Sequence, residues 1–135
     1  MSALTNLYEN AILDGILATA SFTAPTSVSV ALFTSPVSVE ATSALLEAGD
    51  FTNEVDAGGY ARVSATFADA ANGSASTNAN ITWNTASGDW GTVTHVGIVD
   101  NDGQISVHGV LDVAKEILTG DTFEITSGNL TVTLA

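Results

Sequence analysis

The chain of 135 residues has no cysteine and almost no positive charge. The absence of cysteine excludes disulfides, thiolate metal sites and cysteine nucleophiles. Two basic residues, Arg62 and Lys115, stand against 15 acidic residues, and the formal charge is −13. Binding to nucleic-acid phosphates or to an anionic membrane surface needs clusters of Lys and Arg. We therefore expect neither nucleic acid nor a membrane as a partner.

Long hydrophobic runs are also missing, and no stretch is long enough to span a bilayer. The N-terminal segment has no basic residue, and Glu9 and Asp14 interrupt its apolar pattern, so it does not resemble a secretion signal. We expect a protein that is made in the cytoplasm. The acidic surplus has two interpretations, namely solubility in salty surroundings or attraction to a basic partner or to divalent cations.

The apolar residues that are present predict an all-β domain centred on a hairpin at 83–113. Asn101-Asp102-Gly103 lies between two alternating apolar runs, which is a strong hairpin signal. The predicted register pairs Val99 with Gln104, Ile98 with Ile105, Val96 with Val107, His95 with His108, and Val93 with Val110.

About seven short alternating segments, separated by turn residues, predict an antiparallel β-sandwich or jelly-roll-like domain over 27–135. Residues 1–20 predict an N-terminal α-helix, because Leu4, Leu7 and Tyr8 recur at helical spacing and Ser2 or Thr5 could cap it. The whole chain, 1–135, is predicted to be one domain. The irregular acidic stretch at 37–57 is predicted to be a surface excursion and a candidate contact arm.

Two pairs of residues in the hairpin could hold an ion. His95 and His108 could ligate a metal across the strands, but a zinc site needs three or four protein ligands and the sequence places no third one. If the two imidazoles are close, charge repulsion makes it unfavourable to protonate both, and the stability of the hairpin then depends on pH. Asp100 and Asp102 could bind calcium, yet they lack the ligand spacing of an EF-hand loop and also suit a turn. We therefore predict no metal and no cofactor.

Catalytic signatures such as GxSxG, Walker A and HExxH are missing, so the sequence predicts no enzyme. Trp83, Trp90 and Tyr60 could stack on sugar rings, but such aromatic side chains more often fill a core or an interface.

Five stretches follow one another in an order that resembles a family of small virion proteins of tailed bacteriophages: LTNLYENAILDGIL, APTSVSVALFTS, GGYARVSATF, ITWNTASGDWGTVTHVGIVD and GDTFEITSGNLTVTL. The most specific parts are GGYAR at 58–62 and WGTVTHVGI at 90–98, whereas 37–57 matches no pattern. Members of this family are described as tail-fibre-like, and similar small β proteins decorate or cement capsids. The resemblance implies a structural role without catalysis or cofactor.

From this resemblance we expect a capsid decoration or cement protein that bridges capsid subunits. The alternative is a tail-fibre or tail-tip component that binds host-surface glycans. The expected partners are the major capsid protein and further copies of this chain in a homo-oligomer, for which a trimer would suit the three-fold axes of capsids. The expected location is the virion, after assembly in the host cytoplasm. The predicted interface residues are Leu4, Leu7, Tyr8, Leu45, Leu46, Phe51, His95 and His108.

Overall fold

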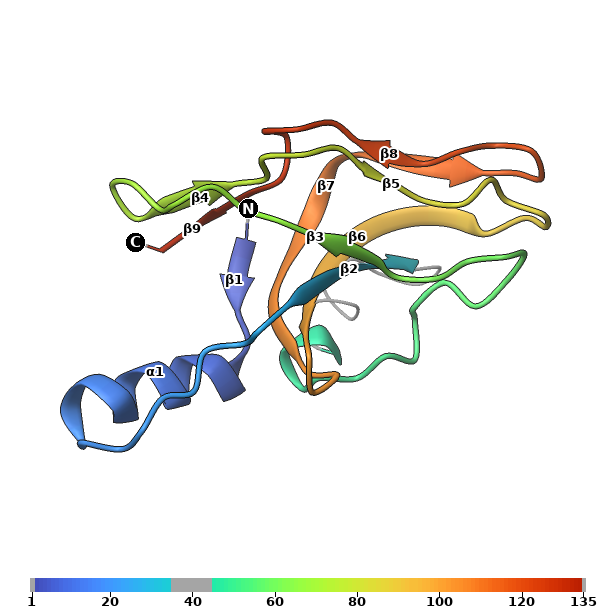
Figure 1. Ribbon diagram of the computed structural model, residues 1–135. Coiled ribbons are helices and arrows are strands. Elements are labelled where there is room, and N and C mark those ends of the chain that lie inside the picture. The colour runs from blue at the N-terminus through green and yellow to red at the C-terminus, as the bar shows by residue number, and fades with distance from the viewer. Residues whose placement is uncertain (1, 35–44, 135) are drawn as a thin grey trace.

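The computed structural model describes residues 2–34 and 45–134, and it is an antiparallel β-sandwich with one N-terminal helix (Figure 1). The main sheet has the strand order β1–β7–β6–β2–β3, with bounds β1 Ser2–Leu4, β2 Val28–Thr34, β3 Val63–Ala65, β6 Gly91–Asp100 and β7 Ile105–Ile117. The second layer consists of two strand pairs, β4 (Ser74–Ser76) with β9 (Thr131–Thr133) and β5 (Ile81–Thr82) with β8 (Glu124–Ile125). The predicted fold class is confirmed.

The main core lies between these two layers. Both tryptophans are buried there, and Trp83 meets Phe123 edge to face with ring centroids 5.2 Å apart. Aromatic pairs of this kind add about 0.5–1.5 kcal/mol to the burial of their surface. The buried members of this core are Val30, Leu32, Val55, Ala65, Ile81, Trp83, Ala86, Trp90, Val93, Val96, Ile117 and Phe123.

The other face of the main sheet is also covered, which explains why the central strand β2 is buried on both sides. Ala31 and Phe33 point to this second face, where a helical turn at 45–47 and the following residues cover them. Leu46 is fully buried in this cluster, and Phe51 stacks on Phe33 at 6.2 Å. The prediction of a surface excursion is therefore wrong for 45–57, because this stretch completes the domain's own core; residues 37–44 lie outside the described part.

The hairpin of β6 and β7 forms as predicted, but its register is wrong. Asp100 pairs with Gln104, which leaves a three-residue loop that ends on Gly103 at φ +80°. A further irregularity follows between Ile98 and Val99, so that Ile98 pairs with Val107 instead of Ile105. Between His95 and Ile98 the shift amounts to two residues, which keeps these side chains on the predicted faces of the sheet. A second irregularity, between Val93 and His95, pairs Val93 with Lys115 instead of Val110 and places Val93 in the main core with Val96.

The same shift separates the two histidines from direct opposition. His95 pairs with Val110, and His108 pairs with Gly97. Both imidazoles nevertheless remain on one face of the sheet, as diagonal neighbours. The predicted cross-strand pair of histidines is therefore wrong in register and correct in face.

The N-terminal helix begins later than predicted. Residues Ser2–Leu4 form the edge strand β1 against β7, and α1 spans Asn6–Leu17. Thr5 stands at the N-cap position, but its hydroxyl donates to the carbonyl of Ile105 at 2.7 Å instead of capping the helix. No helix of the described residues is long and apolar enough to cross a membrane.

Gly97 lies in the middle of β6 against a buried ring. A Cβ at this position would lie 2.9 Å from Cε2 of Phe33, which has no exposed surface. We predict that Gly97→Ala lowers the free energy of unfolding by about 1–3 kcal/mol through overpacking. In Gly97→Ala/Phe33→Leu the smaller side chain should relieve this cost, and urea denaturation should find a double variant more stable than the sum of the two single changes. Strict additivity would show that the close contact is not the cause.

Candidate functional site: an open groove and a projecting helix

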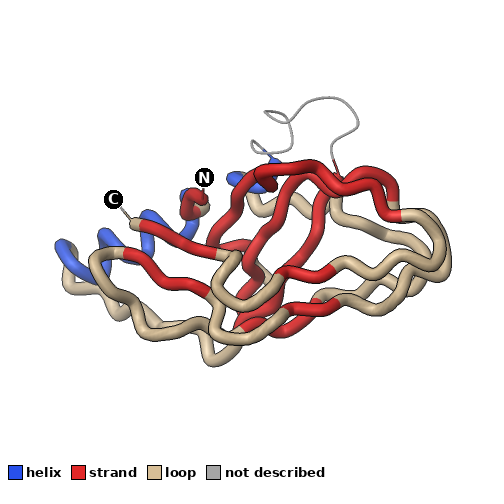
Figure 2. The backbone as a smooth tube through the Cα atoms, turned by 90° about the horizontal axis from the view of Figure 1, so that it is seen from above, coloured by secondary structure: helices blue, strands red, loops and turns tan. Residues whose placement is uncertain are grey.

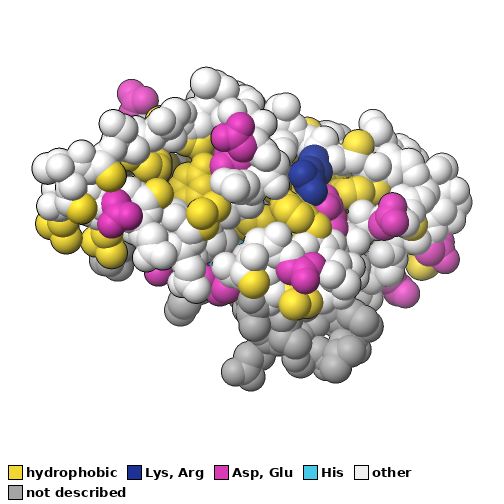
Figure 3. Space-filling model, turned by 90° about the horizontal axis from the view of Figure 1, so that it is seen from below, with side chains coloured by type: hydrophobic (Ala, Val, Ile, Leu, Met, Phe, Trp, Pro, Cys, Tyr) yellow, Lys and Arg dark blue, Asp and Glu magenta, His cyan; other side chains and the backbone are white. Residues whose placement is uncertain are grey.

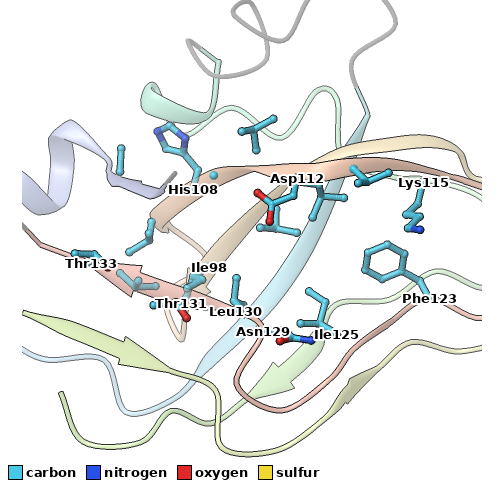
Figure 4. Close-up of a pocket in the computed structure, with 18 of the residues that line it drawn as sticks. Ile98, His108, Asp112, Lys115, Phe123, Ile125, Asn129, Leu130, Thr131 and Thr133 are labelled. Atoms are coloured by element: carbon cyan, nitrogen blue, oxygen red, sulfur yellow. The ribbon is translucent and has the colours of Figure 1, made fainter. Parts of the chain in front are cut away.

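A groove with a volume of about 1250 Å³ opens between β7 and the β8–β9 segment (Figure 4). Its apolar lining comes from both layers of the sandwich and includes Ile98, Leu111, Ile125, Leu130 and Val132. In the close-up, His108, Asp112 and Lys115 lie along β7, across the groove from the C-terminal strand. The sandwich is therefore open along this seam.

The groove exists because β7 is longer than the strand beside it. β1 pairs only with the stretch of β7 from Val107 to Gly109, whereas β7 continues to Ile117. Beyond Gly109, no strand of the described residues pairs with this outer edge. Val110 and Val113 on this edge are 42% and 64% exposed. An unpaired edge with apolar side chains is a ready surface for another polypeptide.

The polar groups of the groove are few and mixed. Lys115 has no carboxylate within ion-pair distance among the described residues. Asn129, Thr131 and Thr133 supply uncharged polar side chains on the opposite wall. A largely apolar groove with scattered polar groups suits binding and positioning more than it suits acid–base chemistry.

At one end of the groove, His108 joins the groove to the helical turn at 45–47. Its Nε2 lies 2.9 Å from Oε1 of Glu47, whose Oε2 accepts the backbone N–H of Asn6 at 3.2 Å. His95 lies next to it without exposed surface, with its Nδ1 2.9 Å from the hydroxyl of Thr94. Burial lowers the pKa of His95, and the nearby His108 lowers it further. Among the described residues no three potential ligands gather into a metal site.

The carboxylate of Asp100 organises the hairpin turn. One oxygen accepts the backbone N–H groups of Asp102 and Gln104 at 2.9 and 2.8 Å, and the other accepts the Tyr8 hydroxyl at 2.5 Å. Burial by itself raises the pKa of Asp100, but these hydrogen bonds to its charged form outweigh it and lower the pKa. Burial raises the pKa of Tyr8, and its bond to Asp100 adds to the effect. The acidic residue at this turn is thus explained by its hydrogen bonds to the backbone of the turn and to Tyr8 of α1.

The predicted interface residues fall into three groups in the structure. Leu4 lines the groove, and Leu7 on α1 is 49% exposed, so both are accessible to a partner. Leu45 is half-buried in the helical turn. The remaining five contribute to the domain itself, because they are buried or hold internal contacts: Tyr8, Leu46, Phe51, His95 and His108.

The aromatic side chains that could have stacked on sugars are part of the core. Trp83 and Trp90 are 2% and 5% exposed, and Nε1 of Trp90 donates to the carbonyl of Gly58 at 3.1 Å. Tyr60 packs edge to face on Trp90, and its hydroxyl donates to Glu54 at 2.9 Å. The prediction of sugar stacking on these rings is therefore wrong, and the prediction that they fill the core is confirmed.

Several residues of this region were not singled out from the sequence. Glu47 bridges His108 and α1 across a long separation along the chain, which no local pattern reveals. Val110 and Val113 were assigned to a paired strand, whereas β1 pairs with β7 only up to Gly109 and both side chains are exposed. The apolar pattern of α1 did contain a signal, because it is wider than one stripe needs.

The lowered pKa of His95 predicts a loss of stability on acidification. The unfolded chain binds a proton near the ordinary value of 6.5, whereas the folded state binds it only at lower pH, so the free energy of unfolding falls as pH falls below about 6.5. Urea denaturation between about pH 7 and pH 5 should show this fall in the wild type and a smaller one in His95→Gln. An equal fall in both proteins would assign the effect to other groups.

Comparison with known proteins supplies the family. The family model of the podophage GP4 fiber I protein gp80 matches residues 3–133 of this chain. No curated protein matches the sequence. The match covers the helix and all strands described above except the first residue of β1. The chain therefore belongs to the family of the podophage GP4 fiber I protein gp80 and is a structural protein of a phage virion.

Proposed function

We propose that this protein is a subunit of a phage tail fibre and that it works by binding other proteins. The family match is the main support for this proposal, since the description of the family names a fibre protein. The description favours the tail-fibre alternative over a capsid decoration protein bound to the major capsid protein. The open groove and the exposed helix support it physically, because a subunit that builds a larger structure needs surfaces for its neighbours.

A role without catalysis fits the groups that line the groove. His108 is engaged by Glu47, and Asp112 and Lys115 are exposed residues on one strand. Catalytic groups are usually held close together by neighbours that perturb their pKa values. We propose that the groove positions another polypeptide and transforms nothing, and that the subunit is assembled in the host cytoplasm.

The tail-fibre alternative also included binding to host-surface glycans, but the tryptophans considered for that role are not on the surface. The rings of Trp83 and Trp90 lie inside the core, where a sugar cannot stack on them. We therefore propose that this subunit contributes to the length and shape of a fibre and that receptor contact belongs to another component.

Copies of this chain are the partners that we propose for the groove. A second polypeptide can add to the free edge of β7 beyond Gly109 and cover Val110 and Val113. Lys115 gives this otherwise acidic molecule a positive charge within the groove. Homo-oligomers are the usual assembly of soluble proteins, and a fibre needs repeated subunits.

The location of the protein in the particle tests the fibre proposal. We predict that a quantitative gel of purified virions finds few copies per particle and that labelled antibody marks the tail. Hundreds of copies spread over the head would instead support the decoration role. Absence of the protein from virions would remove both roles.

Changes on the free edge of β7 test the proposed self-association. We predict that Val110→Glu/Val113→Glu weakens it about tenfold or more, which corresponds to about 1.4 kcal/mol, because it adds charges to an apolar contact between acidic copies. Leu118→Glu is the matched control, since Leu118 is 46% exposed and does not line the groove. Sedimentation velocity of the three proteins measures the effect, and circular dichroism checks the fold. Equal self-association in all three would remove the groove as the contact.

The dependence of self-association on ionic strength is a second test of the same contact. Raising the ionic strength from about 0.15 M to about 1 M shortens the Debye length from about 8 Å to about 3 Å and screens the repulsion between acidic copies. Wild-type association should therefore strengthen with salt. Weakening with salt would indicate that attraction between charges dominates the contact.

A further inference from the structure

The helix α1 is attached to the domain through its N-terminal part. Thr5, just before the helix, donates its hydroxyl to the carbonyl of Ile105 at 2.7 Å, and one turn later the hydroxyl of Tyr8 donates to Asp100. Both Figures 1 and 2 show the rest of α1 projecting beside the strands at one end of the molecule. These hydrogen bonds therefore fix the point at which α1 leaves the domain.

The C-terminal half of α1 carries an apolar stripe with a negative border. Leu13, Ile16 and Leu17 are 53%, 71% and 74% exposed, and their spacing of three and four residues places them on one face of the helix. Asp14, three residues before Leu17, is exposed beside this stripe. The last turn of α1 contains no basic residue, so the carbonyl groups at this end add to the negative charge.

The stripe does not fill the groove of its own chain. That groove, between β7 and the β8–β9 segment, is lined by Glu9 of α1 but by none of the three residues of the stripe. The segment that follows the helix packs Phe22 against Tyr8, with ring centroids 6.2 Å apart, and the stripe stays exposed beside this contact. The groove and the stripe of one molecule are therefore both open to another molecule.

The groove offers the complementary combination, an apolar surface with a positive charge. Leu111, Val113 and Lys115 alternate along β7 and share one face of the strand. Leu111 packs against the main core, which places this face between the two layers of the sandwich. Figure 4 shows Lys115 on the same side of β7 as Phe123, across the groove. Its ammonium group has no carboxylate within ion-pair distance among the described residues.

The dimensions of the groove suit a helix. The edge of β7 beyond Gly109 runs from Val110 to Ile117, which is roughly 26 Å at about 3.3 Å per residue. The 12 residues of α1 span about 18 Å. Packed sheets lie about 10 Å apart, which is close to the diameter of a helix with its side chains. The helix α1 is therefore short and narrow enough to lie along this seam.

Charge favours the groove over the other surfaces of a second copy. Of the two basic residues in the chain, Arg62 is held by Glu54 at 2.8 Å, which leaves Lys115. A contact between two α1 stripes would bring two Asp14 carboxylates together without a cation from either helix. Figure 3 shows acidic side chains scattered over one face of the molecule between apolar ones, where the negative end of α1 meets like charge.

We propose that the stripe of Leu13, Ile16 and Leu17 docks into the groove of the next copy of this chain, with Asp14 beside Lys115 of that copy. The apolar side chains supply the burial, and the two opposite charges fix the position of the helix. This inference rests on the proposed self-association and names the segment that fills the groove. Because helix and groove are different surfaces, each copy binds one neighbour through its helix and another through its groove, and such contacts repeat into a ring or a filament.

Lys115 also sets the direction of the helix in the groove. Carboxylates line the groove elsewhere, namely Glu9, Asp112 and Glu124. The C-terminal end of α1 carries Asp14 and carbonyl groups without helical partners, so it is favoured only next to Lys115.

Two variants and their mixture test the docking. Leu13→Gln/Ile16→Gln/Leu17→Gln removes the stripe, and Val110→Glu/Val113→Glu blocks the groove. All five side chains are exposed and glutamine keeps the helix propensity, so circular dichroism should match the wild type. In sedimentation velocity we expect each variant alone to associate about tenfold or more weakly than the wild type. Their mixture should form a one-to-one complex, because it retains one intact helix and one intact groove.

Exchange of the two charges tests the position of the helix. Asp14→Lys and Lys115→Glu should each weaken association about two- to fivefold. Asp14→Lys/Lys115→Glu keeps the wild-type net charge and should associate like the wild type. Asp69→Lys is the matched control for Asp14→Lys, because Asp69 is exposed and lies outside the groove, and it should not weaken association.

Each other outcome has a definite meaning. Wild-type association of the helix variant alone would overturn the docking while leaving the groove to another segment of a second copy. Wild-type association of the groove variant alone, or a mixture that forms no complex, would overturn it as well. Equal association of Asp14→Lys and Asp69→Lys would refute the pairing with Lys115. A wild type that stays monomeric would instead refute the proposed self-association, and the virion gel measures the fibre role separately.

Discussion

The pairing of β6 with β7, and of β6 with β2, is the constraint on which the rest of the structure depends. These long strands form the middle of the only five-stranded sheet in the described residues. β2 carries four consecutive buried residues, Val30–Phe33, and therefore needs cover on both faces. One cover is the layer that contains Trp83 and Phe123, and the other is the turn with Leu46. The short strands and the irregular segment 45–57 are stable because this sheet gives them a surface to bury.

The same sheet also determines two exposed surfaces, the open edge of β7 and the helix α1. β7 extends beyond β1, so beyond Gly109 no strand of the described residues pairs with this edge of the sandwich. The helix α1 is fixed by Thr5, Asn6 and Tyr8 at its root and carries exposed apolar residues at its far end. Both features leave apolar side chains exposed. They agree with the membership in a family of fibre proteins.

Electrostatics limits which contacts these surfaces can make. Of the two basic residues, Arg62 is held by Glu54 and lies 4.3 Å above the ring of Phe51, where it fixes the segment that covers the second face. Lys115 is the cation that remains, and it lies in the groove. The groove therefore offers a positive charge to an acidic partner, whereas α1 carries no basic residue. An acidic molecule of this kind discriminates between partners by where the few positive charges lie.

The sequence by itself determined the features that depend on local patterns. Alternation predicted the strands, Asn101-Asp102-Gly103 predicted the hairpin, and the order of the motifs predicted the virion family. Only the tertiary structure decided the exact register, because two irregularities in the pairing of β6 with β7 shift it in ways that the alternation of apolar residues does not show. It also decided that Leu46 is core and that apolar side chains of α1 are exposed, since apolar residues look alike in a sequence whether they are buried or not. The site is thus a product of strand lengths and long-range contacts, which are settled only when the whole chain packs.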